Sequence, residues 1–346
     1  MPCLRNTRSI VTILSVVLVI LLAVTYLLSA GSGVAINTAA LHLFRPLPAT
    51  MDSTGNPATP SKVKLGRMLY YEPRLSADQK ISCNTCHPLD AYGAESDPVS
   101  TGFKGQQGTR NAPTVYNAAA HFVQFWDGRA PSVEEQAKGP VTNPVEMAMA
   151  SDTATVHTLK SIPAYAALFK EAFPSDADPI TFNNMALAIG AFERGLVTPS
   201  RWDRYLAGDS NALTDAEKAG FNKFAEAGCH ACHNGAYVGG NSFQKLGIVT
   251  PWPDQKDTGR AGVTKESADK MVFKVPSLRN VKKTAPYFHD GSVATISEAI
   301  RDMAVHQRGA KLSDSDINAI STWFDSLTGE IPADYIKAPE LPKSGS

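Results

Sequence analysis

The stretch Cys83-Asn84-Thr85-Cys86-His87 decides how this chain is interpreted, and Cys229-His230-Ala231-Cys232-His233 repeats its pattern 146 residues later. Both stretches read C-x-x-C-H, the signature of c-type haem attachment, in which two thiols bind one porphyrin and the histidine lies beneath its iron. A C-x-x-C pair has two other readings, a redox-active dithiol and half of a zinc site. A zinc site built from all four cysteines leaves both trailing histidines unexplained. The pattern therefore predicts two covalently bound haems c.

The motifs and the residues between them predict a mostly α fold with two cytochrome c-like domains, each around its own haem. Capping boxes begin helices at Ser132, Thr214 and Thr295. Apolar residues recur at helical spacing at Phe182, Met185, Ala186 and Ile189, and again at Ile317, Ile320, Trp323 and Phe324. Alternation typical of strands is scarce. The two motifs use every cysteine except Cys3, so we expect no structural disulfide.

Composition narrows the class of protein further. The chain has 346 residues, with 33 basic and 33 acidic side chains. A net charge near zero argues against a nucleic-acid-binding protein, which carries a basic excess on one face. Hydrophobic residues make up 43% of the chain, which is enough for a sizeable buried core.

The N-terminus has the pattern of an export signal. Arg5 and Arg8 precede an uncharged apolar run over residues 10–28, and these 19 residues are enough to cross a bilayer as a helix. A cleavable signal has a shorter apolar stretch, so an uncleaved inner-membrane anchor is favoured, with cleavage after Ala30 as the alternative. Either reading predicts that the folded part lies in the periplasm.

These signals divide the chain into five parts. We expect an N-terminal anchor or signal helix over residues 1–30 and a proline-containing linker over 31–60. An N-terminal haem domain is expected over 61–195, a C-terminal haem domain over 196–338, and a tail over 339–346.

The second axial ligand of each iron decides between electron transfer and chemistry. Met303 is predicted for the second haem, because it lies in the middle of the helix begun by Thr295, 70 residues after His233. Methionine–histidine ligation raises the reduction potential of a haem, although a methionine at such a position is often a core residue. For the first haem, His121 and His157 are the downstream histidines before the second motif, and nothing local selects one of them.

Beyond the two motifs, an ordered series of short stretches spans about residues 60–330. They are Arg110-Asn-Ala-Pro-Thr114, Gln124-Phe-Trp-Asp-Gly-Arg129, Gln136-Ala-Lys-Gly-Pro140, Glu146-Met147, Ser200-Arg-Trp-Asp-Arg204, Phe273-Lys-Val-Pro-Ser-Leu-Arg-Asn280 and Pro286-Tyr-Phe-His-Asp-Gly291. In their order and spacing, these stretches resemble the bacterial dihaem cytochrome c peroxidase family. Members of that family reduce hydrogen peroxide to water at the N-terminal haem, with electrons that enter through the C-terminal, high-potential haem.

The resemblance implies a role for each matching residue. His87 is the proximal ligand of the peroxidatic haem, and His233 with Met303 ligates the electron-entry haem. Glu146 corresponds to the distal carboxylate, Gln136 to a distal amide and Trp126 to the tryptophan between the haems. A carboxylate in a semi-buried pocket can move the proton that peroxide cleavage requires. Without the resemblance, Glu146 is better interpreted as a solvated surface carboxylate and Trp126 as a core aromatic residue.

The resemblance also implies further ligands and partners. Asn111, Thr284 and Pro286 match positions that hold a calcium ion between the domains, and amide and carbonyl oxygens suit that cation. A homodimer is common in the family. The electron donor stays open among a small monohaem cytochrome c, a cupredoxin and a membrane quinol oxidase.

One departure from the family pattern concerns the resting state. Many members carry a loop histidine 16 residues after the proximal histidine, which caps the peroxidatic iron until the other haem is reduced. Phe103 occupies that position here and cannot ligate iron. The sequence therefore predicts an open peroxidatic site that needs no reductive activation. The residues that could ligate the peroxidatic iron in place of the loop histidine are Lys104 in its neutral form and His121 after a loop rearrangement.

Two other functions compete with peroxide reduction. Dihaem enzymes that oxidise residues of a partner protein to mature a quinone cofactor are broadly similar, but they have tyrosine where Met303 stands. A non-catalytic dihaem electron carrier has no use for Glu146, Gln136 and Trp126 together. The expected function is therefore that of a dihaem cytochrome c peroxidase.

Overall fold

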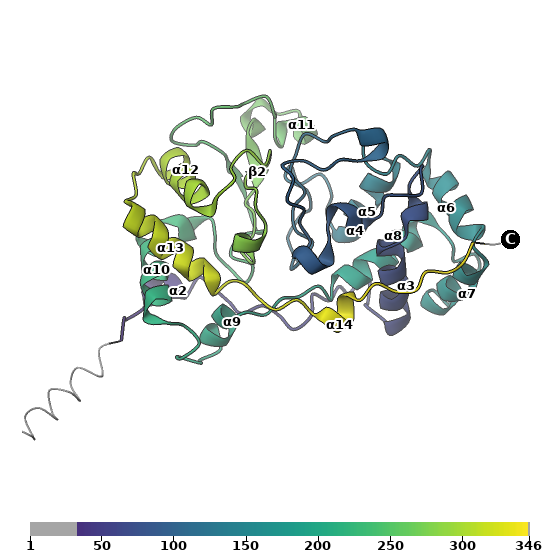
Figure 1. Ribbon diagram of the computed structural model, residues 1–346, viewed down its shortest axis with the longest axis horizontal. Helices are drawn as coiled ribbons and strands as arrows, with labels where there is room; N and C mark the ends of the chain where they lie inside the picture. Colours follow the sequence, from purple (N-terminus) through teal and green to yellow (C-terminus); the bar gives the residue numbers. More distant parts are fainter. Residues whose placement is uncertain (1–32, 345–346) are drawn as a thin grey trace, which may run out of the picture.

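The computed structural model describes residues 33–344, which form two helical lobes side by side (Figure 1). The described chain begins in one lobe, crosses to the other, returns after about residue 196, and crosses once more near its C-terminal end. The mostly helical fold predicted from the sequence is confirmed, with a sheet of two short strands as its extended part.

The first lobe contains helices α3 (Pro60–Tyr70), α4 (Cys83–Cys86), α5 (Val133–Thr142), α6 (Asp152–Lys160), α7 (Pro163–Ala172) and α8 (Phe182–Glu193). The second contains α2 (Thr38–Leu41), α9 (Arg201–Leu206), α10 (Asp215–Glu226), α11 (Ala261–Thr264), α12 (Ile296–Arg308) and α13 (Asp314–Asp325). Its strands β1 (Phe243–Lys245) and β2 (Val272–Lys274) are antiparallel, with Gln244 opposite Phe273. The short helix α14 (Ala333–Ile336) returns to the first lobe.

The three predicted helix starts are confirmed. The side chains of Ser132, Thr214 and Thr295 accept hydrogen bonds from the backbone three residues on, at the N-termini of α5, α10 and α12. At Thr214 the box is reciprocal, since the Glu217 carboxylate accepts from the Thr214 backbone at 2.9 Å. Such a pair satisfies two N–H groups that the first helical turn leaves free.

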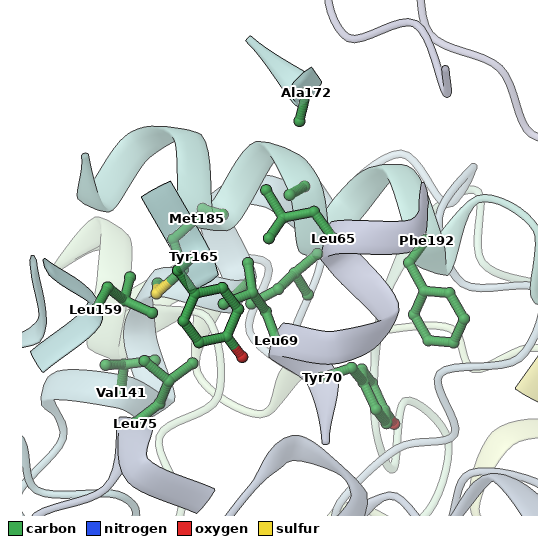
Figure 2. Packing of buried hydrophobic residues seen from close by; sticks show 14 of the residues in the cluster. Leu65, Leu69, Tyr70, Leu75, Val141, Leu159, Tyr165, Ala172, Met185 and Phe192 are labelled. Atoms are coloured by element: carbon green, nitrogen blue, oxygen red, sulfur yellow. The ribbon is translucent and has the colours of Figure 1, made fainter. Parts of the chain in front are cut away.

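Each lobe has its own hydrophobic core. In the first, Leu65 and Leu69 of α3 face Met185 and Phe192 of α8, with Tyr165 of α7 beside them (Figure 2). In the second, α10 packs on α13, and the centre is aromatic. Its largest members are Trp202, Trp323, Phe221 and Phe224. These cores fix the positions of the two loops that carry the C-x-x-C-H motifs.

Two terminal segments differ from the sequence-based division. Ala40 and Phe44, inside the expected linker, are buried in the second core, where Phe44 packs edge-on against Trp202. Ile336, expected in the C-terminal domain, is buried in the core of the first lobe. Prolines made residues 31–60 look like a linker, but the apolar residues between them find tertiary partners that local composition does not reveal.

Within residues 33–344, no helix is long and apolar enough to cross a membrane. The expected anchor over residues 10–28 lies outside the described residues.

Candidate functional site

The first motif forms a single helical turn. The Ser82 backbone donates to Thr85 Oγ1 at 3.0 Å, which begins α4, and the His87 backbone N–H closes on Cys83 O. The buried Tyr70 hydroxyl donates to His87 O at 2.8 Å, which fixes the end of the turn against α3. His87 Nδ1 lies 3.2 Å from Gly93 O, so the ring is held through Nδ1 and Nε2 remains for a metal.

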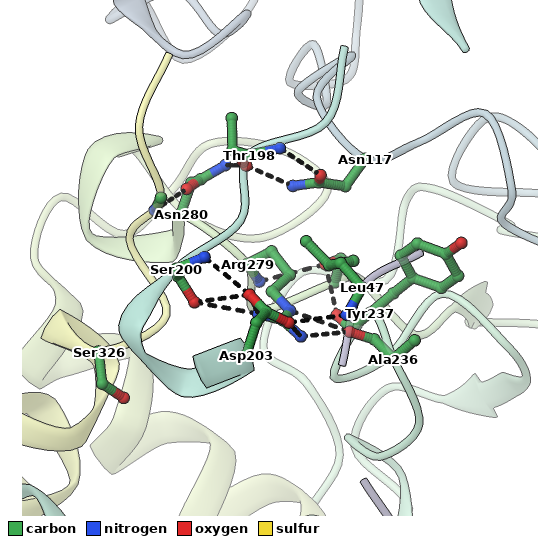
Figure 3. A network of polar contacts seen from close by, with 12 residues as sticks. Leu47, Asn117, Thr198, Ser200, Asp203, Ala236, Tyr237, Arg279, Asn280 and Ser326 are labelled. Atoms are coloured by element: carbon green, nitrogen blue, oxygen red, sulfur yellow. Dashed lines mark hydrogen bonds and ion pairs between the residues drawn. The ribbon is translucent and has the colours of Figure 1, made fainter. Parts of the chain in front are cut away.

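The second motif makes the same kind of turn. Gly228 ends α10 with a φ of 75°, and the His233 backbone N–H donates to Cys229 O at 3.0 Å. Burial lowers the pKa of His233 to about 4 despite the nearby carbonyls of Val238 and Pro276. An imidazole with so low a pKa is neutral, the form that binds metals. The guanidinium of Arg279 fixes the following loop by donating to Ala236 O (Figure 3).

The donor groups of both motifs fit haem better than the alternatives. Burial raises the pKa of the Cys83 thiol to about 12 and that of Cys86 to about 11, whereas redox-active C-x-x-C motifs have lowered thiol pKa values. The cysteines of the two motifs form no disulfide. In the part of the chain that the structure describes, no three histidine, cysteine or acidic side chains converge as a metal site, so the motifs do not combine into a zinc site.

Glu146 is half-buried in the turn after α5, and three influences act on its carboxyl group. Burial raises its pKa, while the positive charge of Arg129 and a hydrogen bond from Asn143 oppose the rise. The Asn143 side-chain amide donates to Glu146 Oε1 at 2.8 Å, and its Oδ1 accepts from the Val145 backbone at 3.0 Å. The carboxyl group is therefore held in one orientation, with its pKa raised by burial.

The loop containing Phe103 is hydrogen-bonded to the backbone of the Glu146 turn. The Phe103 backbone N–H donates to Glu146 O at 2.9 Å, and the Gln106 side chain donates to Pro144 O at 3.0 Å. The Phe103 ring packs against the core of the first lobe, and Lys104 Nζ lies 5.0 Å from the centre of that ring. Gln136 lies on α5, ten residues before Glu146, and is half-buried.

The other histidines considered for the first haem lie elsewhere. His157 is exposed on α6, and His121 is buried against the loop after the second motif, with its ring edge-on to Tyr237.

Met303 lies half-buried on α12, and the end of that helix reaches the second motif. The Arg308 side chain occupies the space where a side chain at Gly228 would extend, directly before Cys229. The structure thus brings α12 next to the attachment turn that precedes His233.

Trp126 lies where the two lobes meet. Its indole N–H donates to Asn111 O at 2.9 Å, and its backbone carbonyl accepts from the backbone N–H of Lys274 in β2 at 2.7 Å. The ring packs with Trp252, Phe273 and other apolar residues of the second lobe. The ring is therefore held by its hydrogen bond to Asn111 on one side and by the apolar residues of the second lobe on the other.

The three positions considered for calcium come from two segments that are in contact. The Asn111 backbone N–H donates to His289 O at 2.8 Å, and His289 belongs to the segment that also contains Thr284 and Pro286. The Asn111 side-chain amide donates to Pro98 O at 3.2 Å. The Thr284 hydroxyl donates to Val281 O at 3.3 Å.

Sequence reasoning missed three residues of this region. Asn143 was not singled out, because its role depends on the turn that brings it back to Glu146. Arg129 and Lys274 were quoted only as parts of matching stretches. For Arg129 and Lys274, the sequence signal that could have identified them was their position as charged residues inside stretches that match the family.

The chain was compared with known proteins. A family profile described as di-haem cytochrome c peroxidase matches residues 60–211. The chain is 43% identical over 317 residues to the cytochrome c551 peroxidase of Pseudomonas aeruginosa, covering 90% of each protein. It is 44% identical over 292 residues to that of Nitrosomonas europaea, covering 84% of this chain and 86% of the relative.

A solved structure is also similar. The crystal structure of a MauG-like protein associated with microbial copper homeostasis superimposes with a TM-score of 0.74 and 28% identity, over 85% of this chain and 97% of that one. With two haem-attachment turns in two lobes and relatives of this identity over most of its length, the chain belongs to the di-haem cytochrome c peroxidase family.

Proposed function

We propose that this protein reduces hydrogen peroxide to water in the periplasm, with electrons from a small redox protein. Cys83, Cys86 and His87 would hold the haem whose iron would bind peroxide. Cys229, Cys232, His233 and Met303 would hold the haem that would accept the electrons. The observation that carries the proposal is the carboxyl group of Glu146, oriented and half-buried in the lobe of the first motif. Relatives named cytochrome c551 peroxidase support the same activity.

Glu146 is proposed to move the proton. Peroxide cleavage needs a proton taken from the inner oxygen and delivered to the outer one, and an ionised carboxylate can accept it and return it. The hydrogen bond from Asn143 leaves the carboxylate one oriented oxygen atom for this exchange. Gln136 is proposed to contribute an amide to the same pocket, since its side chain can both donate and accept hydrogen bonds.

Trp126 is proposed as the electron bridge between the two haems. Its contacts with both lobes support this role, because they hold the ring at the junction. Asn111, Thr284 and Pro286 are proposed to hold a calcium ion at the same junction, where amide and carbonyl oxygens suit a hard cation.

The peroxidatic site is proposed to be open in the oxidised enzyme. Phe103 is half-buried against the core of the first lobe, and its loop is hydrogen-bonded to the Glu146 turn, so the loop is held beside the proposed proton carrier. The protein is further proposed to be anchored to the inner membrane by its N-terminal segment and to form a homodimer.

Oxidation of a partner protein is the second candidate, and the open peroxidatic site that Phe103 predicts favours it, because the quinone-maturing enzymes share an open haem. Met303 weighs against it, because the resemblance implies tyrosine at this position in the quinone-maturing enzymes.

Steady-state peroxide consumption with a reduced monohaem cytochrome tests the proposed function. Glu146→Gln is expected to lower kcat/KM for peroxide by about 10²–10⁴-fold, since general acid–base catalysis contributes this much. Glu135→Gln is the matched control, because Glu135 is an exposed carboxylate on α5, and this variant should leave kcat/KM for peroxide unchanged. Oxidised wild-type enzyme should turn over without a lag. Full activity of Glu146→Gln would refute the role of the carboxylate, and a lag abolished by prior reduction would refute the open site.

A further inference from the structure

The turn over residues 125–129 contacts both lobes. Trp126 packs with apolar residues of the second lobe. The Phe125 ring lies on α5 instead, 3.5 Å from the place that a β-carbon at Gly139 would take. Gly139 is one helical turn before Asn143, so these two positions share a face of the helix. One side of the turn thus contacts the second lobe, and the other contacts the helix that leads to the proposed proton carrier.

Arg129 ends this turn, and two groups hold its guanidinium. The guanidinium carbon lies 3.4 Å from the centre of the Phe125 ring, and Nη1 donates to both carboxylate oxygens of Asp127, at 3.0 and 3.1 Å. The ring shields one face of the cation from water. The charge of Arg129 also acts through space on Glu146, where it opposes the rise in pKa that burial causes. Arg129 therefore serves two carboxylates, one by direct contact and one at longer range.

A second arginine shares Asp127 and connects it to the second lobe. The Asp127 carboxylate is buried, and Arg110 Nη1 donates to its Oδ2 at 2.6 Å. The other nitrogens of Arg110 donate to both oxygens of Asp257, Nε at 2.6 Å and Nη2 at 2.8 Å. Asp257 belongs to the loop of the second lobe between β1 and α11. Two-pronged pairs of this kind are strong and fix geometry. Four alternating charges thus run from Asp257 to Arg129.

The same loop holds the turn at a second point. Arg260 donates to Asp127 O at 3.3 Å and lies 4.0 Å from the centre of the Phe243 ring. That ring fills the space where a side chain at Gly128 would extend. Gly128 has a φ of 68°, a conformation that favours glycine. The second lobe therefore fixes the backbone of the turn and, through Arg110, its charged side chains.

We propose that Arg129 is a positioning residue for the Glu146 carboxylate and that the second lobe fixes it through Asp257. Because Arg110 neutralises part of the Asp127 charge, Arg129 keeps the capacity to stabilise the ionised form of Glu146. The lobe that would accept the electrons thereby sets the charge state of the group that would move the proton. This inference rests on the proposed function, in which that carboxylate carries the proton.

Other titratable groups near Glu146 do not take this role. Cys86 of the first motif lies close enough for the Glu146 charge to raise its thiol pKa, but this sulfur would be bonded to the haem and would not titrate. Lys104 is in the loop that is hydrogen-bonded to the Glu146 turn, and its ammonium group lies over the Phe103 ring. Arg129 is thus the cation whose charge lowers the pKa of Glu146.

Infrared titration of the holoenzyme tests the proposal without turnover. The carboxylic acid C=O band that disappears in Glu146→Gln identifies the group, and the pH midpoint of this band reports its protonation. Arg129→Met removes a positive charge, so the midpoint is expected at higher pH, whereas Arg129→Lys should stay nearer the wild-type value. Asp257→Asn removes a negative charge and leaves Arg110 to Asp127 alone, so the midpoint is expected at lower pH.

A double-mutant comparison shows whether the effect of the second lobe passes through Arg129. In the Arg129→Met background, Asp257→Asn should shift the midpoint little or not at all. Asp254→Asn is the matched control, because Asp254 lies in the same loop with a 53% exposed side chain, and it should leave the midpoint unchanged. An equal shift from Asp257→Asn in both backgrounds overturns the proposal. An unchanged midpoint in Arg129→Met overturns it as well.

Failure of this inference and failure of the proposed function give different results. If Glu146→Gln keeps full peroxidase activity while the midpoints move as expected, the proposed function fails and the control of the carboxyl group stands. If Asp257→Asn does not carry two haems, a crystal structure of the wild-type holoenzyme decides. An unbroken chain of ion pairs from Asp257 to Arg129 supports the proposal, and an Arg129 guanidinium turned away from Glu146 into solvent refutes it.

Discussion

At the scale of single residues, the pKa of Glu146 sets the pH range of the proposed reaction. The carboxyl group must be ionised to accept a proton, so activity should fall as the pH drops through its pKa. Burial raises this pKa, and the Arg129 charge and the Asn143 hydrogen bond favour the ionised form and hold it down. Removal of either neighbour should therefore move the acid limb of the pH profile to higher pH.

Asn143→Ala tests this directly. The variant loses the 2.8 Å hydrogen bond to Glu146 Oε1, so the acid limb of kcat/KM for peroxide is expected at higher pH than in the wild type. At high pH, where the carboxyl group is ionised in both proteins, the difference should shrink. Asn183→Ala, at an exposed position on α8, is the control. A profile of Asn143→Ala that falls everywhere by the same factor, without moving, would show that Asn143 acts only on stability.

At the scale of elements, each lobe is built on a close crossing of two helices at a glycine. Gly66 of α3 faces the backbone of α8 at Ala188, and Gly220 of α10 faces the backbone of α13 at Ala319. A β-carbon at either glycine would overlap the facing carbonyl oxygen. In both lobes the first of these helices precedes the haem-attachment turn, and α10 ends at Glu226, shortly before Cys229.

Gly66→Ala is therefore expected to destabilise the protein, although alanine favours helices. Overpacking in a well-packed core costs about 1–3 kcal/mol, because the two helices must move apart. Gly139→Ala in α5 is the matched control, since its β-carbon would lie at an ordinary 3.5 Å from the Phe125 ring. That variant should be as stable as the wild type or slightly more stable. Thermal unfolding of both holoproteins, followed by far-ultraviolet circular dichroism, measures the difference, and equal midpoints for Gly66→Ala and the wild type would contradict the expectation.

The same elements indicate how far the sequence alone could lead. Thr214 and Glu217 predicted the start of α10 because a capping box is local, and the C-x-x-C-H turns are local as well. The burial of Phe44 could not be predicted from its proline-containing segment, because it depends on contacts with Trp202 and Phe221, which lie far along the chain. The contact between His121 and Lys274 joins residues 153 positions apart, and no spacing rule connects them. The sequence therefore predicted the capping boxes and the haem-attachment turns, whereas it could not predict which distant segments bury one another.

At the scale of the whole molecule, the chain ties the two lobes together at both ends. Phe44, near the start of the described residues, is buried in the second core before the chain crosses to the first lobe. Near the other end, Tyr335 stacks on Phe192 at 5.2 Å, and its hydroxyl donates to Phe192 O at 2.7 Å. These crossings hold the lobes near each other, but their mutual orientation requires a contact at the junction itself.

The fully buried hydroxyl of Thr198, in the connection between the lobes, supplies such a contact. Its Oγ1 accepts from Asn117 of the first lobe at 2.7 Å and from Asn280 of the second at 2.9 Å (Figure 3). Thr198→Val keeps the shape but leaves both amides without an acceptor, which should cost about 1–3 kcal/mol for each buried group. Thr198→Ser keeps the acceptor and should retain most of the stability. If the hydroxyl also sets the orientation of the lobes, rapid-mixing measurements should show slower electron transfer between the haems in Thr198→Val at temperatures where it is folded. A Thr198→Val protein with wild-type stability and transfer rate would mean that the crossings alone orient the lobes.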